Sequence, residues 1–263
     1  MKKITKLFAL VLALAMVFAL ASCGGSKEET TVYAVEAGSA GEALAQENGW
    51  EINSVDSQAR ALMEVDAGTS DAAVIDLLMA GAMVGEGTSY PDLVFGEELT
   101  SEEYGVGCRK GSDLAQYINV FFQESYADGT MQQIAETYGV QAALVEQGEV
   151  ETFTQAETDS DVAYIQDKGT LVVGVTDFDP MDYKDDNGEW IGFDADMARA
   201  VAEKLGVEVE FVEIDWDNKI FELDAKSIDV VWNGMTLTDE VMGAMECTNA
   251  YCKNAQVVVT PAE

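Results

Sequence analysis

Short apolar runs alternate with amphipathic helical patterns along most of the chain, and this alternation constrains the fold more than any other feature. The run Ala72–Ile75 precedes a helical pattern at Leu77–Val84, and Val207–Ile214 precedes one at Trp216–Ala225. Alternation of this kind is typical of α/β units with largely parallel sheets. The same spacing predicts strands at Thr31–Val35, Leu93–Phe95, Tyr104–Arg109, Leu171–Val175 and Ile228–Trp232, and helices at Gly41–Glu47, Ser57–Ala67, Asp113–Tyr126, Thr130–Tyr138, Asp161–Asp167 and Phe193–Leu205.

Two segments between these elements have a distinct composition. Residues 145–160 are rich in acidic residues and have no apolar periodicity, which predicts a linker. The segment Lys184–Gly188 is a predicted hairpin turn, because its Asn-Gly pair readily adopts the positive φ angles that such turns need. Its acidic residues superficially suggest a calcium loop, but the alternating oxygen ligands and the distant Glu of such a loop are absent.

The N-terminal segment has the pattern of an export signal. Three lysines precede the apolar run Leu7–Leu20, which is shorter than the about 20 residues of a transmembrane helix. The sequence Leu-Ala-Ser-Cys that ends at Cys23 is typical of a lipobox, whose Cys is acylated after cleavage. An ordinary signal peptide with an incidental Cys is the alternative. We predict a lipoprotein signal peptide at 1–22 and a tether at 23–30, which would anchor the protein by lipid on the outer face of the cytoplasmic membrane.

The formal net charge of −35 limits the kinds of partner. A surface this acidic repels phosphate backbones, so no nucleic acid is expected as a partner. It also disfavours peripheral binding to anionic lipid, which makes a covalent anchor the expected route to the membrane. Solubility of an exported protein is the simplest interpretation of the charge.

The chain has no histidine, which excludes Ser-His and Cys-His catalysis and the usual zinc sites. We therefore predict no metal and no cofactor. Cys108 lies in an apolar run and is expected in the core. Cys247 and Cys252 flank a predicted turn, where export would permit a disulfide. Two free thiols are equally compatible with that spacing.

The stretch from Gly169 to Thr260 carries the most specific motifs. In order they are Gly-Thr-Leu-Val-Val-Gly-Val, Asp-Pro-Met-Asp-Tyr, Gly-Glu-Trp-Ile-Gly-Phe-Asp-Ala-Asp-Met-Ala and Ile-Asp-Val-Val-Trp-Asn-Gly-Met-Thr-Leu-Thr. This order strongly resembles the first lobe of family 3 extracytoplasmic solute-binding proteins, the amino-acid receptors of ABC importers. The resemblance implies an α/β, two-lobed periplasmic-binding-protein-like fold of type II. It also implies a monomer that binds an amino acid or related amine between its lobes and delivers it to ABC permease subunits.

The first half of the chain resembles the second lobe of the same family. Val35–Glu42 is similar to the turn that opens that lobe, Ser70–Asp76 to its central strand and Tyr104–Gly111 to the strand that returns through the hinge. The segment order is then a circular permutation, and a rearranged or truncated gene is the alternative explanation. The predicted domains are the second lobe at 31–103, the hinge strand and terminal helices packing on the first lobe at 104–144, the linker at 145–160 and the first lobe at 161–263.

The resemblance implies that three side chains hold the ligand directly. Phe178 and Trp216 correspond to the aromatic rings that sandwich the ligand side chain, and the alternative is that both are ordinary core aromatics. Asp76 corresponds to the carboxylate that pairs with the ligand's α-ammonium, an interaction that burial strengthens. A helix-capping Asp is the competing interpretation of this position.

Backbone groups would hold the ligand's carboxylate. Ser39 and Ala40 lie in a glycine-flanked turn before a helix, where free N–H groups and the helix dipole attract anions. Asn233, Gly234 and Thr236 correspond to a loop whose backbone and Thr hydroxyl contact the carboxylate.

One position departs from the family pattern. Val241 stands where family members usually have an Arg that binds the ligand carboxylate in a bidentate manner. Glu36 also faces the implied pocket. Together these residues favour a cationic ligand over a standard α-amino acid, and Lys219 or Lys253 is a candidate replacement for the Arg.

Two other functions are compatible with the same architecture. One is a ligand-sensing lipoprotein without a transport role. The other is a dehydratase, which needs an oriented general acid and cationic groups for the substrate's carboxylates. The absence of His and of the family Arg argues against the dehydratase, so we do not expect an enzyme.

Overall fold

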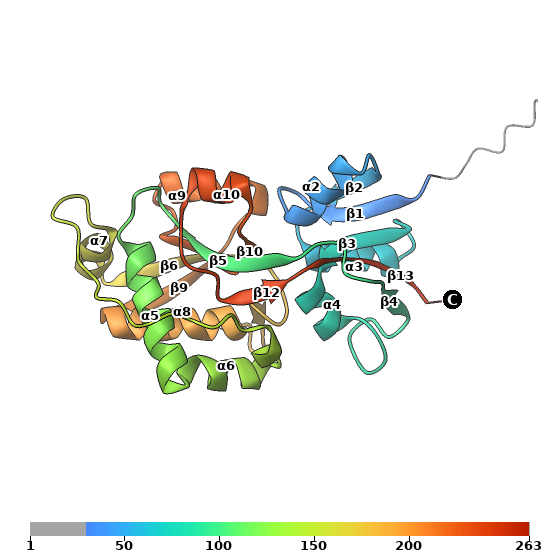
Figure 1. Ribbon diagram of the computed structural model, residues 1–263. Helices are drawn as coiled ribbons and strands as arrows, with labels where there is room; N and C mark the ends of the chain where they lie inside the picture. Colours follow the sequence, from blue (N-terminus) through green and yellow to red (C-terminus); the bar gives the residue numbers. More distant parts are fainter. Residues whose placement is uncertain (1–29, 263) are drawn as a thin grey trace, which may run out of the picture. The chain divides into compact units, whose positions relative to one another are not determined.

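Two β-sheets organise residues 30–262, which are the residues that this computed structural model describes (Figure 1). Both sheets lie within one structural unit, Thr31–Glu263. Helices pack against each sheet, which confirms a two-lobed α/β fold. The signal peptide predicted at 1–22 and the lipid predicted on Cys23 lie outside the described residues, as does all of the tether except Thr30.

The second lobe is built on a five-stranded sheet with the order β2-β1-β3-β13-β4. Its strands are β1 (Val32–Glu36), β2 (Glu51–Val55), β3 (Ala72–Asp76), β4 (Leu93–Phe95) and β13 (Gln256–Pro261), and its helices are α2 (Ala40–Glu47), α3 (Gln58–Asp66) and α4 (Leu77–Met83). The first three strands run parallel to one another. All of β3 is buried, as its apolar run predicts.

The last strand of the chain completes this sheet. β13 lies antiparallel between β3 and β4, with Val257 opposite Ile75 and Val259 opposite Phe95. Both valines are fully buried. The strand therefore departs from the predicted first-lobe boundary of 161–263. A run of valines favours a buried strand, but the sheet that it joins depends on distant partners.

The first lobe is built on a sheet with the order β11-β5-β10-β6-β9, and β12 also pairs with β5. Its parallel strands β6, β9 and β10 are joined antiparallel by β5, so the sheets are mixed rather than largely parallel. The strands are β5 (Glu102–Cys108), β6 (Thr170–Val175), β9 (Glu208–Glu213), β10 (Val230–Thr236), β11 (Glu246–Cys247) and β12 (Cys252–Asn254), with a separate hairpin of β7 (Tyr183–Lys184) and β8 (Trp190–Ile191). The helices are α5 (Leu114–Asp128), α6 (Thr130–Tyr138), α7 (Asp161–Lys168), α8 (Phe193–Leu205), α9 (Lys219–Asp224) and α10 (Asp239–Ala244), with short 3-10 turns η1 (Gln141–Ala143) and η2 (Trp216–Asn218).

Two antiparallel segments connect the lobes within the described residues. β5 pairs with β12, with Tyr104 opposite Cys252 and Glu102 opposite Asn254, and the chain continues from β12 directly into β13 (Figure 1). These paired strands thus link the two sheets.

A buried ion network links the end of β5 to α7 and to the start of β10 in the first lobe. Arg109 follows β5 and makes a bidentate contact with Asp161, at 2.9 and 3.1 Å, where α7 begins. Its second partner is Asp229, which also accepts a 2.6 Å bond from Lys168. Residues 145–160 before α7 contain neither helix nor strand, as a linker requires.

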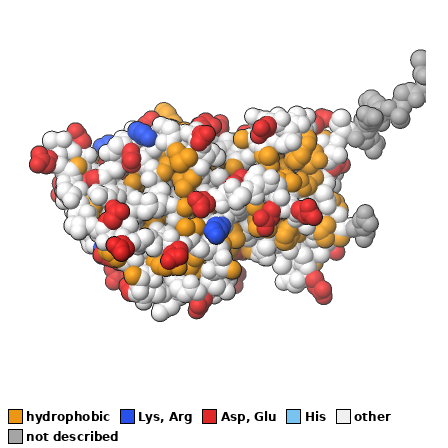
Figure 2. All heavy atoms as spheres, viewed as in Figure 1, with side chains coloured by type: hydrophobic (Ala, Val, Ile, Leu, Met, Phe, Trp, Pro, Cys, Tyr) orange, Lys and Arg blue, Asp and Glu red, His pale blue; other side chains and the backbone are white. Residues whose placement is uncertain are grey.

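The three cysteines among the described residues are free thiols. Cys108 is fully buried, as predicted, and Cys252 is buried as well. Figure 2 shows Asp and Glu side chains spread over the visible face of the protein with few Lys and Arg among them. Across residues 30–262, every helix is too short or too polar to cross a membrane.

Candidate functional site

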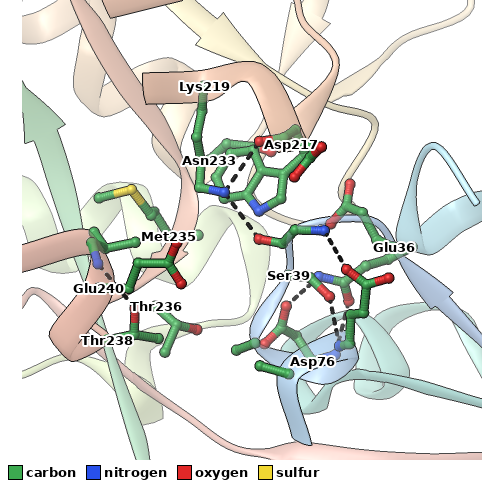
Figure 3. Close-up of a pocket in the computed structure, with 18 of the residues that line it drawn as sticks. Glu36, Ser39, Asp76, Asp217, Lys219, Asn233, Met235, Thr236, Thr238 and Glu240 are labelled. Atoms are coloured by element: carbon green, nitrogen blue, oxygen red, sulfur yellow. Dashed lines mark hydrogen bonds between the residues drawn. The ribbon is translucent and has the colours of Figure 1, made fainter. Parts of the chain in front are cut away.

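A cavity of about 380 Å³ opens between the two lobes. Figure 3 shows Ser39, Glu36 and Asp76 on one side of it and Thr238 and Glu240 on the other. Nine residues that the sequence predicts to contact a ligand line this one cavity: Glu36, Ser39, Ala40, Asp76, Phe178, Trp216, Asn233, Gly234 and Thr236. Their contact with a ligand stays a prediction.

Asp76 lies where β3 ends and α4 begins. It occupies the N-cap position, yet its side chain makes no capping hydrogen bond, so the helix-capping interpretation is wrong. The carboxylate instead accepts hydrogen bonds from the side-chain amides of Gln58, Asn254 and Gln256, the last at 2.7 Å. These three amides hold the carboxylate in a fixed orientation beside the cavity.

A second carboxylate shares this amide cluster. Glu102 Oε2 accepts hydrogen bonds from Asn254 at 3.2 Å and from Gln256 at 3.0 Å. It also accepts one from the Thr236 hydroxyl at 3.2 Å. Burial raises the pKa of Asp76 to about 7, and the charge of Glu102 adds to the increase.

Glu36 ends β1 and is only 2% exposed. Its Oε1 atom is buried and has no hydrogen-bond partner. Burial is the largest cause that raises the pKa of Glu36 to about 8, followed by the charge of Asp76, while Lys219 opposes the increase. The cavity therefore contains two neighbouring carboxyl groups that are both costly to ionise.

The two predicted aromatic residues border the cavity while remaining largely buried. Phe178 packs edge-on to Tyr104, with ring centroids 6.2 Å apart. Its ring also lies against Gly234, where φ is +54° and a Cβ would come within 2.5 Å of Phe178 Cε1. Trp216 lies in η2, with the Lys219 ammonium 4.9 Å from the centroid of its ring. Both rings are buried in the core and also line the cavity.

Lys219 is the candidate cation that the structure places at the cavity. Its Nζ donates to the Trp216 carbonyl at 3.1 Å and, across the cavity, to the Gly38 carbonyl at 2.9 Å (Figure 3). Burial lowers the pKa of Lys219. Lys253 lies on β12, is exposed, and does not line the cavity.

The predicted anion-binding turn before α2 already holds a carboxylate of the chain. Ser39 caps the helix by accepting a 3.0 Å bond from the Glu42 N–H, and Glu42 Oε2 accepts a 2.8 Å bond from the Gly38 N–H. This arrangement is a variant of the capping box, with the Glu side chain reaching one residue further back. One N–H predicted for a ligand carboxylate is therefore occupied.

The segment 233–236, which resembles a loop of the family, lies within strand β10 where the pairing with β5 is irregular, and its polar groups are also satisfied internally. The Gly234 N–H donates a 2.6 Å bond to Asp194, and the Asn233 side chain bonds to Thr176 and Asp182. These bonds fix this part of β10 against the Phe178 ring. The Asn233 amide and the Gly234 N–H are thus positioning groups in this structure. The Val241 side chain lines the cavity, and its N–H caps α10 by donating to Thr238.

The amide cluster around Asp76 was missing from the sequence prediction. Gln58 begins α3, far along the chain from Asn254 and Gln256. The alternation Asn254-Ala-Gln256 could have predicted that the two amides lie together, because residues two apart on a strand point to the same side. Their contact with Asp76 could not be predicted, because it depends on the pairing of β13 with β3, in which Gln256 lies opposite Asp76.

Comparison with known proteins identifies the C-terminal part of the chain. Residues 171–263 match the bacterial extracellular solute-binding proteins, family 3. The L-cystine-binding protein TcyJ of Escherichia coli (strain K12) is 38% identical over 77 residues, which cover 29% of this chain and 29% of the relative. The arginine-binding extracellular protein ArtP of Bacillus subtilis (strain 168) is 32% identical over 94 residues, which cover 35% of this chain and 36% of the relative. The chain thus spans about a third of the length of the curated relatives it matches.

Solved structures match over a similar share. The ancestral cationic amino acid solute-binding protein AncCDT-1 is 45% identical, over 32% of this chain and 37% of that chain, with a TM-score of 0.31. Arginine-bound truncated ArgBP from T. maritima is 41% identical, over 31% of this chain and 39% of that chain, with a TM-score of 0.30. Residues 171–263 are thus similar to family 3 of the bacterial extracellular solute-binding proteins.

Proposed function

We propose that this protein is an extracytoplasmic receptor that binds an amino acid or a related amine between its lobes. The observation that carries the proposal is the pair of buried carboxyl groups, Glu36 and Asp76, which line one cavity together with Phe178 and Trp216. Carboxylates that are buried beside aromatic surfaces suit a ligand with a protonated amine and a hydrocarbon part. Relatives whose names describe cystine-, arginine- and histidine-binding proteins support this class of solute.

Binding would be coupled to closure of the lobes. The cavity takes residues from both lobes, so a ligand that contacts Asp76 and Trp216 favours the state in which they lie close together. The paired strands β5 and β12 would act as the hinge, because they connect the lobes.

Delivery to an ABC importer completes the proposed role. A lipid on Cys23 would hold this receptor, as a monomer, on the outer face of the cytoplasmic membrane, close to the permease subunits. The proposed circular permutation is supported by β13, a C-terminal strand that completes the sheet of the N-terminal half.

A thermal-shift screen of amino acids and amines tests the proposal. A ligand at a hundred times its dissociation constant stabilises the folded state by about 2.7 kcal/mol. We expect Asp76→Ala and Trp216→Ala to abolish the shift of the best ligand. The matched controls Asp92→Ala and Trp190→Ala should keep it, because neither residue lines the cavity. If the cavity variants keep the shift, the site is wrong, and if no solute produces one, the receptor role is wrong.

A further inference from the structure

The cavity is strongly acidic on all sides. Lys219 is its one basic residue, against six carboxylates among the lining residues: Glu36, Glu42, Asp76, Asp217, Asp239 and Glu240. Glu36 provides evidence beyond this clustering, because it is 2% exposed and its Oε1 atom lacks a hydrogen-bond partner. A buried acceptor without a partner is costly, and a ligand cation would satisfy it.

The groups suited to a ligand carboxylate are largely occupied by the protein itself. Glu42 takes the Gly38 N–H, Asp194 takes the Gly234 N–H, and Glu102 takes the Thr236 hydroxyl. In each case the acceptor is a carboxylate of the chain. A carboxylate on the ligand would therefore compete with an internal carboxylate for the same donor.

Lys219 has little hydrogen-bonding capacity left for a ligand carboxylate. Two of its three N–H groups donate to the carbonyls of Gly38 and Trp216, and it makes no ion pair among the described residues. Val241 presents an apolar side chain to the same cavity. A carboxylate entering here would lose its hydration without gaining a bidentate partner.

We propose that the cavity selects a diamine-like cation that carries no carboxylate, with one ammonium held by Glu36 and Asp76. This inference rests on the proposed receptor function. The faces of Phe178 and Trp216 would cover the methylene chain. The second ammonium would meet Glu240 and Asp239, since Glu240 lies on the side of the cavity away from Glu36 and Asp76 (Figure 3).

Proton linkage gives this selectivity a measurable signature. The pKa of Glu36 is raised to about 8 and that of Asp76 to about 7. Asp76 and Lys219 face Glu36, while Glu102 and Tyr104 face Asp76. An ammonium favours the ionised carboxylates, so its binding releases protons. Amine affinity should rise as the pH increases from about 6 to about 8.

Three matched pairs of solutes test the proposal by titration calorimetry on the full chain. Cadaverine, putrescine and agmatine are lysine, ornithine and arginine without the carboxylate. We expect the amine of each pair to bind at least tenfold more tightly than its amino acid. If the amino acids bind equally or better, or if another solute binds and none of these amines does, the inference is overturned and the receptor function stands. If no solute binds, both are overturned.

Variants of the cavity distinguish effects of charge on ligand binding from effects on the stability of the fold. Glu36→Gln should weaken cadaverine binding at least tenfold and flatten its dependence on pH. Val241→Arg should weaken cadaverine and strengthen lysine binding, whereas Met242→Arg, on the exposed side of the same helix, should change neither. Lys219→Met affects the contact between the lobes for both solutes alike, so the ratio of cadaverine affinity to lysine affinity should stay unchanged. A rise in that ratio would show that Lys219 holds a carboxylate. Circular dichroism melts check that each variant is folded.

Discussion

The Lys219 ammonium of the first lobe donates a hydrogen bond of 2.9 Å to the Gly38 carbonyl of the second lobe. This bond crosses the cavity and joins the lobes directly. The same ammonium lies against the Trp216 ring, which restricts the position of the side chain. The lobes are thus held together at the cavity as well as through the paired strands β5 and β12.

Removing this bond should loosen the unliganded protein. We expect Lys219→Met to lower the free energy of unfolding by about 1–2 kcal/mol, because the buried Trp216 carbonyl and the half-buried Gly38 carbonyl lose a charged donor. Its radius of gyration in small-angle scattering should increase without ligand. Lys253→Met is the control, since Lys253 is exposed and away from the cavity. An unchanged radius in Lys219→Met would show that the bond does not hold the lobes.

The buried carboxyl groups predict a characteristic dependence of stability on pH. Folding raises the pKa of Glu36 to about 8 and the pKa values of Asp76 and Asp194 to about 7. A raised carboxyl pKa means that the folded state binds the proton more tightly, so this stabilisation is fully present below about pH 4 and is lost as the pH rises through 7–8. The unliganded protein should melt at progressively lower temperatures from pH 5 to pH 8.

Substitution of Glu36 separates its contribution to the pH dependence of stability from the contributions of the other buried carboxyl groups. Each unit of raised pKa corresponds to about 1.4 kcal/mol, so Glu36→Gln should visibly flatten the decline in melting temperature. Glu240→Gln removes an exposed carboxylate from the same cavity and should leave the slope unchanged. Equal slopes for wild type and Glu36→Gln would contradict the assignment.

Gly234→Ala should displace the Phe178 ring, which lines the cavity. The added Cβ would meet the Phe178 ring at 2.5 Å, and φ is +54° at this position. We expect a loss of about 1–3 kcal/mol in denaturant unfolding, together with weaker ligand binding. Gly243→Ala in α10 is the control, because a Cβ there meets nothing within 4 Å. That change should be neutral or stabilise by about 0.5–1 kcal/mol.

The buried network at Arg109 should contribute far more than a surface ion pair. Arg109→Met leaves Asp161 and Asp229 without their shared partner, and we expect a loss of about 3–5 kcal/mol in denaturant unfolding. Lys184→Met breaks the pair with Glu213, whose side chains are 47% and 59% exposed. That loss should be below about 1 kcal/mol. Similar losses in the two variants would mean that the network does not stabilise the first lobe.

Local patterns allowed most helices and strands to be predicted, because period and capping are properties of neighbouring residues. Phe193–Leu205 has the predicted bounds, and Ala72–Ile75 is extended by one residue to Asp76. The short elements β2, β11 and α10 were missed. Segments of this length contain too little pattern to separate strand, helix and loop.

The residues that line the candidate site could be predicted from the sequence, but the hydrogen bonds among them could not. The nine predicted residues line one cavity, whereas the occupied donors emerge only in three dimensions. Glu42 reaches the Gly38 N–H within one turn, and Asp194 reaches Gly234 across the lobe. Whether a donor is free for a ligand depends on such distant partners. Sequence therefore predicts the location of the cavity better than its preference for charge.

A crystal structure of the protein with its tightest ligand from the screen would show where that ligand binds. We expect electron density for the ligand between the lobes, beside Phe178 and Trp216, with a nitrogen within hydrogen-bond distance of Asp76 or Glu36. Ligand density at another place on the protein, with this cavity empty, would contradict this expectation.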